Sequence, residues 1–164
     1  MMSRKQTLAS DVLASLEAKK LSLATAESCT GGGVGQALTA VPGSSRVYRG
    51  GIISYTNEVK SGLLHVPETL LRDLGAVSGP VAEAMARGAQ AALSADVAVS
   101  TTGLAGPGGG GFGNPVGTVW IACAGPGGVE SVLCRFQGNR EEIREAACCR
   151  ALELVLETLN GLET

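Results

Sequence analysis

Segments with the apolar pattern of helices and of strands alternate along this chain, and that alternation constrains its fold most. Residues 7–19 repeat apolar positions at helical spacing, and residues 21–27 (LSLATAE) are typical of a buried strand. Later segments continue the alternation. We expect further helices at 30–40, 67–74, 79–94 and 139–159, and further strands at 50–55, 96–101, 116–124 and 129–136. Such an order is typical of an α/β domain with helices on both faces of a sheet.

The last two expected strands indicate that the sheet is mixed. A Gly-Pro-Gly-Gly turn joins 116–124 to 129–136, which predicts an antiparallel hairpin. We therefore predict a three-layer α/β/α sandwich with a mixed, five-stranded sheet. A single domain over residues 1–164 is expected, because this length fits one domain and can bury a sizeable core. Asn139 is the expected N-cap of the last helix, with Glu142 completing a capping box.

Composition and charge exclude several classes of protein. Hydrophobic residues make up 45% of the chain and charged residues 17%, which is typical of a globular protein. The net charge is −2 and no basic stripe occurs, so we expect no nucleic-acid partner. No apolar run is long enough to span a membrane, and residues 1–20 resemble an amphipathic helix rather than a secretion signal. We therefore expect no membrane partner and a cytoplasmic location.

The five cysteines and the single histidine give no metal-binding pattern. The cysteine count is odd and no CxxC occurs, as expected for reduced thiols in a reducing cytoplasm. A metal site needs grouped ligands, and His65 stands alone between apolar neighbours. We expect neither a metal nor a cofactor.

Two glycine-rich loops follow expected strands, at residues 25–33 (TAESCTGGG) and 101–115 (TTGLAGPGGGGFGNP). Ligands of such sheets bind beyond the carboxyl ends of strands. Ser28 at a strand-to-helix turn could act as a nucleophile, and nearby N–H groups could hold an oxyanion. Two alternatives stay open: Ser28 or Thr30 could simply cap the helix, and Cys29 could be the nucleophile instead. The GxSxG motif of α/β-hydrolases is absent.

A nucleophilic serine needs a base, and Lys60 is the candidate. A Ser–Lys pair is a known alternative to Ser–His, provided that burial or nearby positive charge keeps the lysine neutral. Tyr55 could pass a proton or orient the lysine. The competing interpretation is that Tyr55 ends a strand and Lys60 is exposed to solvent. The loop at 103–115 could bind an anion through successive N–H groups, form an active-site lid, or simply connect two strands.

Several ordered segments together resemble the C-terminal domain of the competence/damage-inducible CinA family, including its stand-alone form, nicotinamide-nucleotide amidohydrolase. They are AESCTGG at 26–32, PGSS at 42–45, GGIISYTNEVK at 50–60, GAVS at 75–78, TGLAGPGG at 102–109 and PVGTVW at 115–120. The resemblance runs from about residue 7 to residue 159. It also implies a mixed five-stranded α/β/α sandwich.

The resemblance implies that the chain deamidates nicotinamide mononucleotide to nicotinate mononucleotide and ammonia, without a metal. Ser28 would be the nucleophile, Lys60 the general base and Tyr55 a partner of both. The implied substrate-binding residues are Cys29, Thr30, Gly31, Gly32, Ser45, Gly103, Gly106 and Arg140. A homo-oligomer is also expected.

Two features limit what the resemblance carries over. Loop 109–114 lacks the acidic and lysine residues often found there, so it could close differently over substrate. The larger family members carry an upstream domain, whose activity we do not transfer to this chain. A non-catalytic ligand-binding or interaction module is the alternative function.

Overall fold

The computed structural model describes residues 1–109 and 112–162, and its centre is one five-stranded sheet in the order β2-β1-β3-β4-β5. The strands are β1 (Leu23–Glu27), β2 (Tyr48–Ile53), β3 (Val97–Gly103), β4 (Thr118–Gly125) and β5 (Gly128–Arg135). Strand β1 pairs in parallel with β2 and β3, whereas β4 is antiparallel to β3 and β5. The predicted mixed sheet and its hairpin are confirmed.

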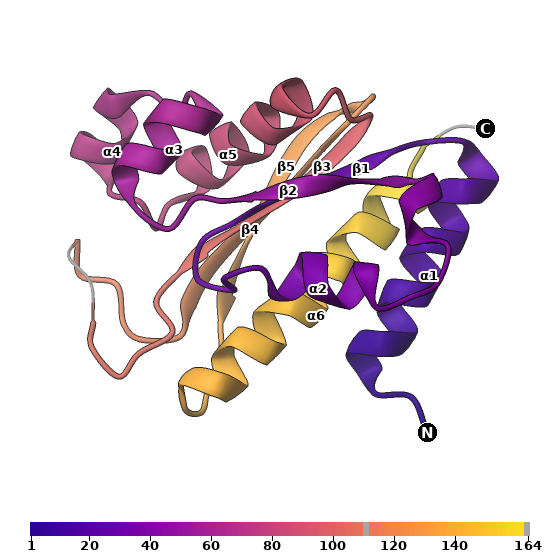
Figure 1. Ribbon diagram of the computed structural model, residues 1–164. Coiled ribbons are helices and arrows are strands. Elements are labelled where there is room, and N and C mark those ends of the chain that lie inside the picture. Colours follow the sequence, from indigo (N-terminus) through magenta and orange to yellow (C-terminus); the bar gives the residue numbers. More distant parts are fainter. Residues whose placement is uncertain (110–111, 163–164) are drawn as a thin grey trace.

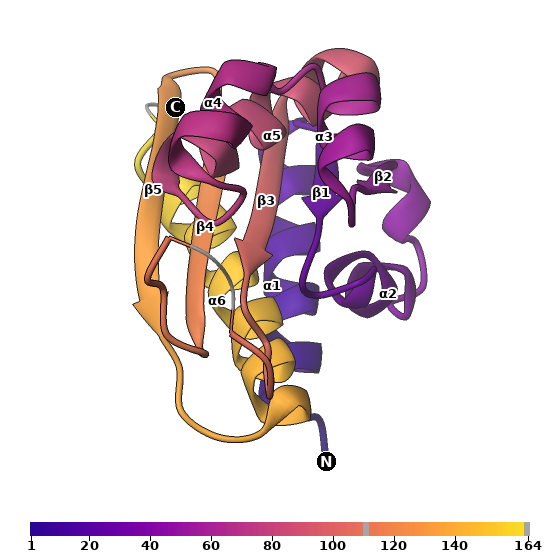
Figure 2. The ribbon, with the colours of Figure 1, turned by 90° about the vertical axis from the view of Figure 1, so that its left-hand side faces the viewer.

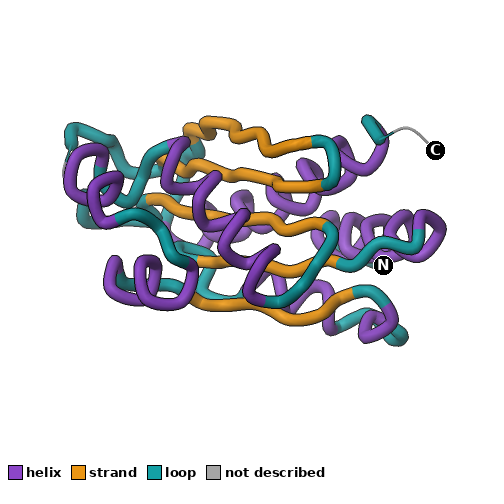
Figure 3. Tube along the Cα trace, turned by 90° about the horizontal axis from the view of Figure 1, so that it is seen from above, coloured by secondary structure: helices purple, strands orange, loops and turns teal. Residues whose placement is uncertain are grey.

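Helices cover both faces of this sheet (Figures 1 and 3). One face carries α1 (Arg4–Lys19), α2 (Gly33–Thr39) and α6 (Arg140–Asn160), and the other carries α3 (Asn57–Leu64), α4 (Glu68–Leu74) and α5 (Gly79–Ala92). A short 3-10 turn, η1 (Ser44–Arg46), precedes β2. The predicted three-layer α/β/α sandwich is confirmed.

The core explains why these segments take these places. Strand β1 is buried along its whole length, and the apolar face of α6 packs on the sheet beside α1 and α2. A second apolar cluster lies under α5 on the opposite face. The Asn139 side chain accepts from the Glu142 N–H at 2.9 Å while the Glu142 carboxylate accepts from the Asn139 N–H at 3.0 Å, so the predicted capping box is confirmed.

One local prediction is wrong, and one helix was missed. The helix after β1 begins at Gly33 rather than at residue 30, because Gly31 and Gly32 have φ of 59° and 102°, outside the helical range. Helix α3 was not expected at all. It follows Thr56, whose hydroxyl accepts from the Val59 N–H at 3.3 Å and so caps the helix.

The parallel strands bring three loops to one end of the sheet. Strands β1 and β2 end at Glu27 and Ile53, which pair with each other, and β3 continues two residues past Thr101, the partner of Glu27, to end at Gly103. The chain that follows β1 and the chain that follows β3 leave the sheet in the same direction (Figure 2). None of the helices in the described residues combines the length and the apolar character that crossing a membrane requires.

Candidate active site

The turn between β1 and α2, residues 28–32, holds Ser28 at the end of the buried strand. The Ser28 N–H donates to the Thr101 carbonyl of β3 at 3.0 Å, and the Gly31 N–H donates back to the Ser28 carbonyl at 3.0 Å. These bonds fix Ser28 to the central strands, and its side chain lies at the wall of a cavity. The turn therefore presents a serine hydroxyl from a rigid support.

Neither Ser28 nor Thr30 caps α2, so that alternative is wrong. The Glu27 carboxylate caps the helix instead, accepting from the Val34 and Gly35 N–H groups at 2.9 Å each. It also accepts from the Thr30 hydroxyl at 2.5 Å. This buried carboxylate ties the turn to the helix and leaves the Ser28 hydroxyl free for Lys60.

Lys60 lies on α3, on the opposite face of the sheet from α2, and its side chain reaches Ser28. Its side chain is buried, with 1% of the residue exposed, so the interpretation of Lys60 as a surface residue is wrong. The Nζ atom lies 3.0 Å from the Ser28 Oγ and 2.8 Å from the Ser54 carbonyl oxygen. A third contact, at 3.3 Å, is to the Tyr55 carbonyl oxygen. All three partners are uncharged oxygens.

Burial lowers the pKa of the Lys60 ammonium from its usual 10.5 to about 8, because the charged form loses its hydration. The neutral amine is thus available close to neutral pH. Burial raises the pKa of the neighbouring Cys29 thiol to about 11, so that sulfur stays protonated. Of the two candidate nucleophiles, the Ser28 hydroxyl is the one that Lys60 contacts, and this geometry favours serine over cysteine.

These groups open into a cavity of about 330 Å³ beyond the carboxyl ends of the strands. Its walls come from the turn at residues 28–32 (hereafter the nucleophile turn), the start of α3, the segment before α5, the loop after β3 and the start of α6. The lining residues are Ser28, Cys29, Tyr55, Asn57, Lys60, Ala76, Val77, Thr102, Gly103, Leu104, Ala105, Gly106, Gly108 and Arg140.

Arg140 and Tyr55 meet at the mouth of this cavity. One Arg140 Nη atom donates to the Gly106 carbonyl at 2.7 Å, and the other donates to the Tyr55 hydroxyl at 3.3 Å. The Tyr55 phenol is therefore a partner of Arg140. Only the Tyr55 backbone carbonyl contacts Lys60, so the structure does not bring the phenol into hydrogen-bond contact with either catalytic candidate.

The remaining predicted site residues fall into three groups. Cys29, Gly103 and Gly106 line the cavity, whereas Thr30, Gly31 and Gly32 form the turn behind it. Ser45 does not reach the cavity. It is exposed in η1, before the amino end of β2, and the cavity lies at the carboxyl end of that strand.

Two side chains around the turn were missed by sequence reasoning. Glu27 caps α2, and Arg144 donates to the Cys29 carbonyl at 3.0 Å and to the Thr30 carbonyl at 3.2 Å. The available signals were local: Glu27 directly precedes Ser28, and Arg144 lies one helical turn after Arg140.

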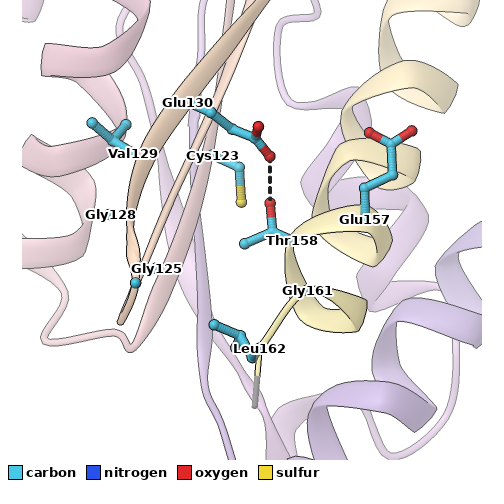
Figure 4. A pocket seen from close by; sticks show the side chains of 10 residues that line it. Cys123, Gly125, Gly128, Val129, Glu130, Glu157, Thr158, Gly161 and Leu162 are labelled. Carbon is cyan, nitrogen blue, oxygen red and sulfur yellow. Dashed lines mark hydrogen bonds between the residues drawn. The ribbon is translucent and has the colours of Figure 1, made fainter.

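A second cavity, of about 290 Å³, lies between the β4–β5 turn and the end of α6 (Figure 4). The Thr158 hydroxyl donates to the Glu130 carboxylate there at 3.4 Å. Burial raises the pKa of the nearby Cys123 thiol to about 11, so it is protonated at neutral pH. No group of three or more His, Cys, Asp or Glu side chains in residues 1–109 and 112–162 is arranged to hold a metal ion.

The family described as the CinA C-terminal domain matches residues 5–159. The chain belongs to this family. A nicotinamide-nucleotide amidohydrolase PncC of Pseudomonas putida is 49% identical over 133 residues, which are 81% of this chain and 83% of that protein. A CinA-like protein of Parasynechococcus marenigrum is 50% identical over 149 residues, 90% of this chain but 36% of that protein. This CinA C-terminal domain thus spans little more than a third of such longer relatives.

Solved structures of the family share the fold of this CinA C-terminal domain. The competence/damage inducible protein CihA from Agrobacterium tumefaciens superposes with a TM-score of 0.92 at 40% identity, covering 98% of each chain. A CinA superfamily protein from Klebsiella pneumoniae gives 0.94 at 34% identity, covering 96% of this chain and 99% of that one.

Proposed function

We propose that this CinA C-terminal domain hydrolyses the carboxamide of nicotinamide mononucleotide, releasing ammonia and nicotinate mononucleotide. The observation that carries the proposal is the 3.0 Å contact between the buried Lys60 amine and the Ser28 hydroxyl in the wall of a cavity. The substrate is taken from the Pseudomonas putida relative, whose name gives the activity of that protein.

In the first half of the reaction, neutral Lys60 takes the proton of the Ser28 hydroxyl while the oxygen attacks the amide carbon. The carbonyl oxygen becomes an oxyanion, which the Cys29 and Thr30 N–H groups would stabilise. Protonated Lys60 then gives its proton to the amide nitrogen as the carbon–nitrogen bond breaks. Ammonia leaves, and the nicotinoyl group stays on Ser28 as an ester.

The second half of the reaction uses the same groups with water as nucleophile. Lys60 takes a proton from water as the water oxygen attacks the ester carbon, and returns it to the Ser28 oxygen. The product carboxyl group loses its remaining proton to solvent, and nicotinate mononucleotide leaves as its carboxylate. A base with a pKa of about 8 suits this cycle, because roughly a tenth of the molecules hold neutral lysine at about pH 7.

Arg140 is the proposed partner of the substrate phosphate. A guanidinium has five N–H donors, and in this site two of its nitrogens bind Gly106 and Tyr55 across the cavity mouth. The remaining donors can pair with phosphate oxygens, a geometry that arginine suits well. Glycines in the loop after β3 leave room for the nucleotide beside Arg140.

The test is ammonia release from nicotinamide mononucleotide by wild type and by single variants. Ser28→Ala and Lys60→Ala should each lower kcat by about 10³-fold or more, because each removes a group from the reacting unit. Cys29→Ala is the matched control and should retain most of the activity. Full activity in Ser28→Ala with loss in Cys29→Ala would transfer the nucleophile to the thiol.

The alternative function as a binding module is tested in the same preparation by calorimetry. Binding of nicotinamide mononucleotide to wild type without any ammonia release would reject the hydrolase proposal and leave a ligand-binding role. Release of ammonia together with nicotinate mononucleotide, identified by mass spectrometry, supports the hydrolase.

A further inference from the structure

Within the nucleophile turn, the carbonyl of each of residues 28–30 has a fixed partner. The Ser28 carbonyl accepts from the Gly31 N–H at 3.0 Å, and the Thr30 carbonyl accepts from the Gly33 N–H at 3.0 Å. The Cys29 carbonyl is held by a side chain, the Arg144 Nε at 3.0 Å, and the Arg144 Nη2 also reaches the Thr30 carbonyl at 3.2 Å. Arg144 thus holds two successive peptide units of this turn, Cys29–Thr30 and Thr30–Gly31.

Of the two N–H groups in these peptide units, the Gly31 N–H is used to hold the Ser28 carbonyl at 3.0 Å, and the Thr30 N–H remains available. In a trans peptide the N–H points opposite to the C=O, and the bonds of this turn are trans. The Thr30 N–H therefore points away from Arg144, and the Cys29 N–H away from the Ser28 carbonyl. Neither N–H donates to a backbone carbonyl in the described part of the chain. Cys29 lines the cavity and Arg144 does not.

We propose that Arg144 is a positioning residue of the oxyanion site, where the Thr30 and Cys29 N–H groups stabilise charge beside Ser28. It holds the Cys29 carbonyl and so aims the Thr30 N–H of the same peptide unit. It also holds the Thr30 carbonyl, whose peptide unit carries the Gly31 N–H that fixes the Ser28 carbonyl and with it the Cys29 N–H. This role rests on the proposed function. Arg144 reaches no reacting atom and acts only through the two peptide groups. The inference adds to the Ser28–Lys60 pair a residue from α6, on the opposite face of the sheet from Lys60.

Arginine suits this position for a geometric reason. The Nε and one Nη of a guanidinium form a rigid, planar pair of donors that can hold two adjacent carbonyls at once, whereas a lysine ammonium is a single point. The neighbouring Gly31 supports the arrangement. A Cβ built there would lie 3.0 Å from the Arg144 Nη2, and its φ of 59° already disfavours any side chain.

The first test measures the turn itself and needs no substrate. Backbone amide order parameters from NMR relaxation should be near 0.85 for residues 28–31 in wild type and should fall towards 0.6 in Arg144→Met. Arg144→Lys should give intermediate values, because one of the two carbonyls keeps a donor. The matched control is Arg150→Met on the same helix, whose ion pair with Glu157 is remote from the turn, and its order parameters should equal those of wild type.

The second test measures catalysis with nicotinamide mononucleotide. Arg144→Met should lower kcat by roughly 10²-fold while KM stays within about threefold, because the oxyanion exists only in the transition state. The kcat–pH profile should keep its midpoint, since the contacts of Lys60 are unchanged. Gly31→Ala should lower kcat in the same way through displacement of the guanidinium.

The outcomes separate the two proposals. Equal order parameters in wild type and Arg144→Met, or a rise in KM with unchanged kcat, would overturn the positioning role. A turn that is rigid in wild type and loosened in Arg144→Met, in a protein that releases no ammonia, would support the positioning role and reject the proposed substrate.

Discussion

Burial of Lys60 predicts a specific dependence of stability on pH, which the variant Lys60→Met isolates. In the folded protein the pKa of Lys60 is lowered to about 8 by burial, while an unfolded chain keeps the usual 10.5. Between these values the unfolded chain binds one more proton than the folded protein. The free energy of unfolding therefore rises with pH across this window, and below it the folded protein carries a buried ammonium at full cost.

The size of the effect follows from the two pKa values. The difference in bound protons between the unfolded and the folded protein, integrated over pH from about 7 to about 9.5, is about 1.4. At about 1.36 kcal/mol per unit, this gives about 2 kcal/mol of added stability. Methionine has a similar length and no titratable group, so Lys60→Met lacks this term. Loss of the hydrogen bonds to Ser54 and Tyr55 affects the variant at both pH values and cancels in the comparison.

The assay is urea unfolding of both proteins at the two pH values, under reducing conditions. The wild type should gain about 2 kcal/mol more than Lys60→Met between them. Other groups, including the thiols, titrate in both proteins and drop out of the double difference. Parallel changes in wild type and variant would mean that Lys60 titrates as an exposed lysine does, and the proposed base would be lost.

Three further predictions concern the pH profile of the reaction, the cap of α2 and the packing of the helix glycines. The kcat/KM for nicotinamide mononucleotide should rise with pH and level off above about 8, because Lys60 must be neutral in the free enzyme; a profile that falls through this range would contradict a lysine base. Glu27→Gln should lower the free energy of unfolding by about 1–3 kcal/mol, since an amide leaves one N–H at the start of α2 unpaired; an unchanged urea midpoint would refute the cap. Gly88→Ala should destabilise the protein, because the new Cβ in α5 would lie 2.1 Å from the Leu64 carbonyl oxygen. Gly62→Ala in α3, with open space around it, should stabilise the protein by about 0.5–1 kcal/mol. Thermal melts that shift in the same direction for both variants would reject this packing.

The sheet and its layers could be predicted because they depend on patterns within short segments. Residues 21–27 are mostly apolar or small, which is typical of a buried strand. The turn at 125–128 joins two apolar runs with almost no loop, which only an antiparallel hairpin allows. Asn139 and Glu142 form a capping box from adjacent positions in the chain, so their pairing could be predicted without tertiary contacts.

The site was harder to predict because its contacts join distant segments. The spacing of Tyr55 and Lys60 does not reveal that α3 carries the amine beneath the end of β1. The sequence alone does not show whether a lysine at this position is buried or exposed. Glu27 was assigned to a strand, and only the position of α2 shows that its carboxylate accepts from the N–H groups at the start of that helix.

The contacts of Lys60 also bear on why a lysine is buried at this position. Its three acceptors are uncharged oxygens, and no carboxylate of residues 1–109 or 112–162 contacts the amine, so the ammonium form gains little from its surroundings. A lysine that served only stability would be paired with a carboxylate or exposed at its amine, as long cationic side chains usually are. A site that needs a neutral amine beside a hydroxyl requires the opposite, since a nearby carboxylate would raise the pKa of the lysine. The fold therefore accepts a destabilising group where the proposed chemistry needs it, as proteins do at functional sites.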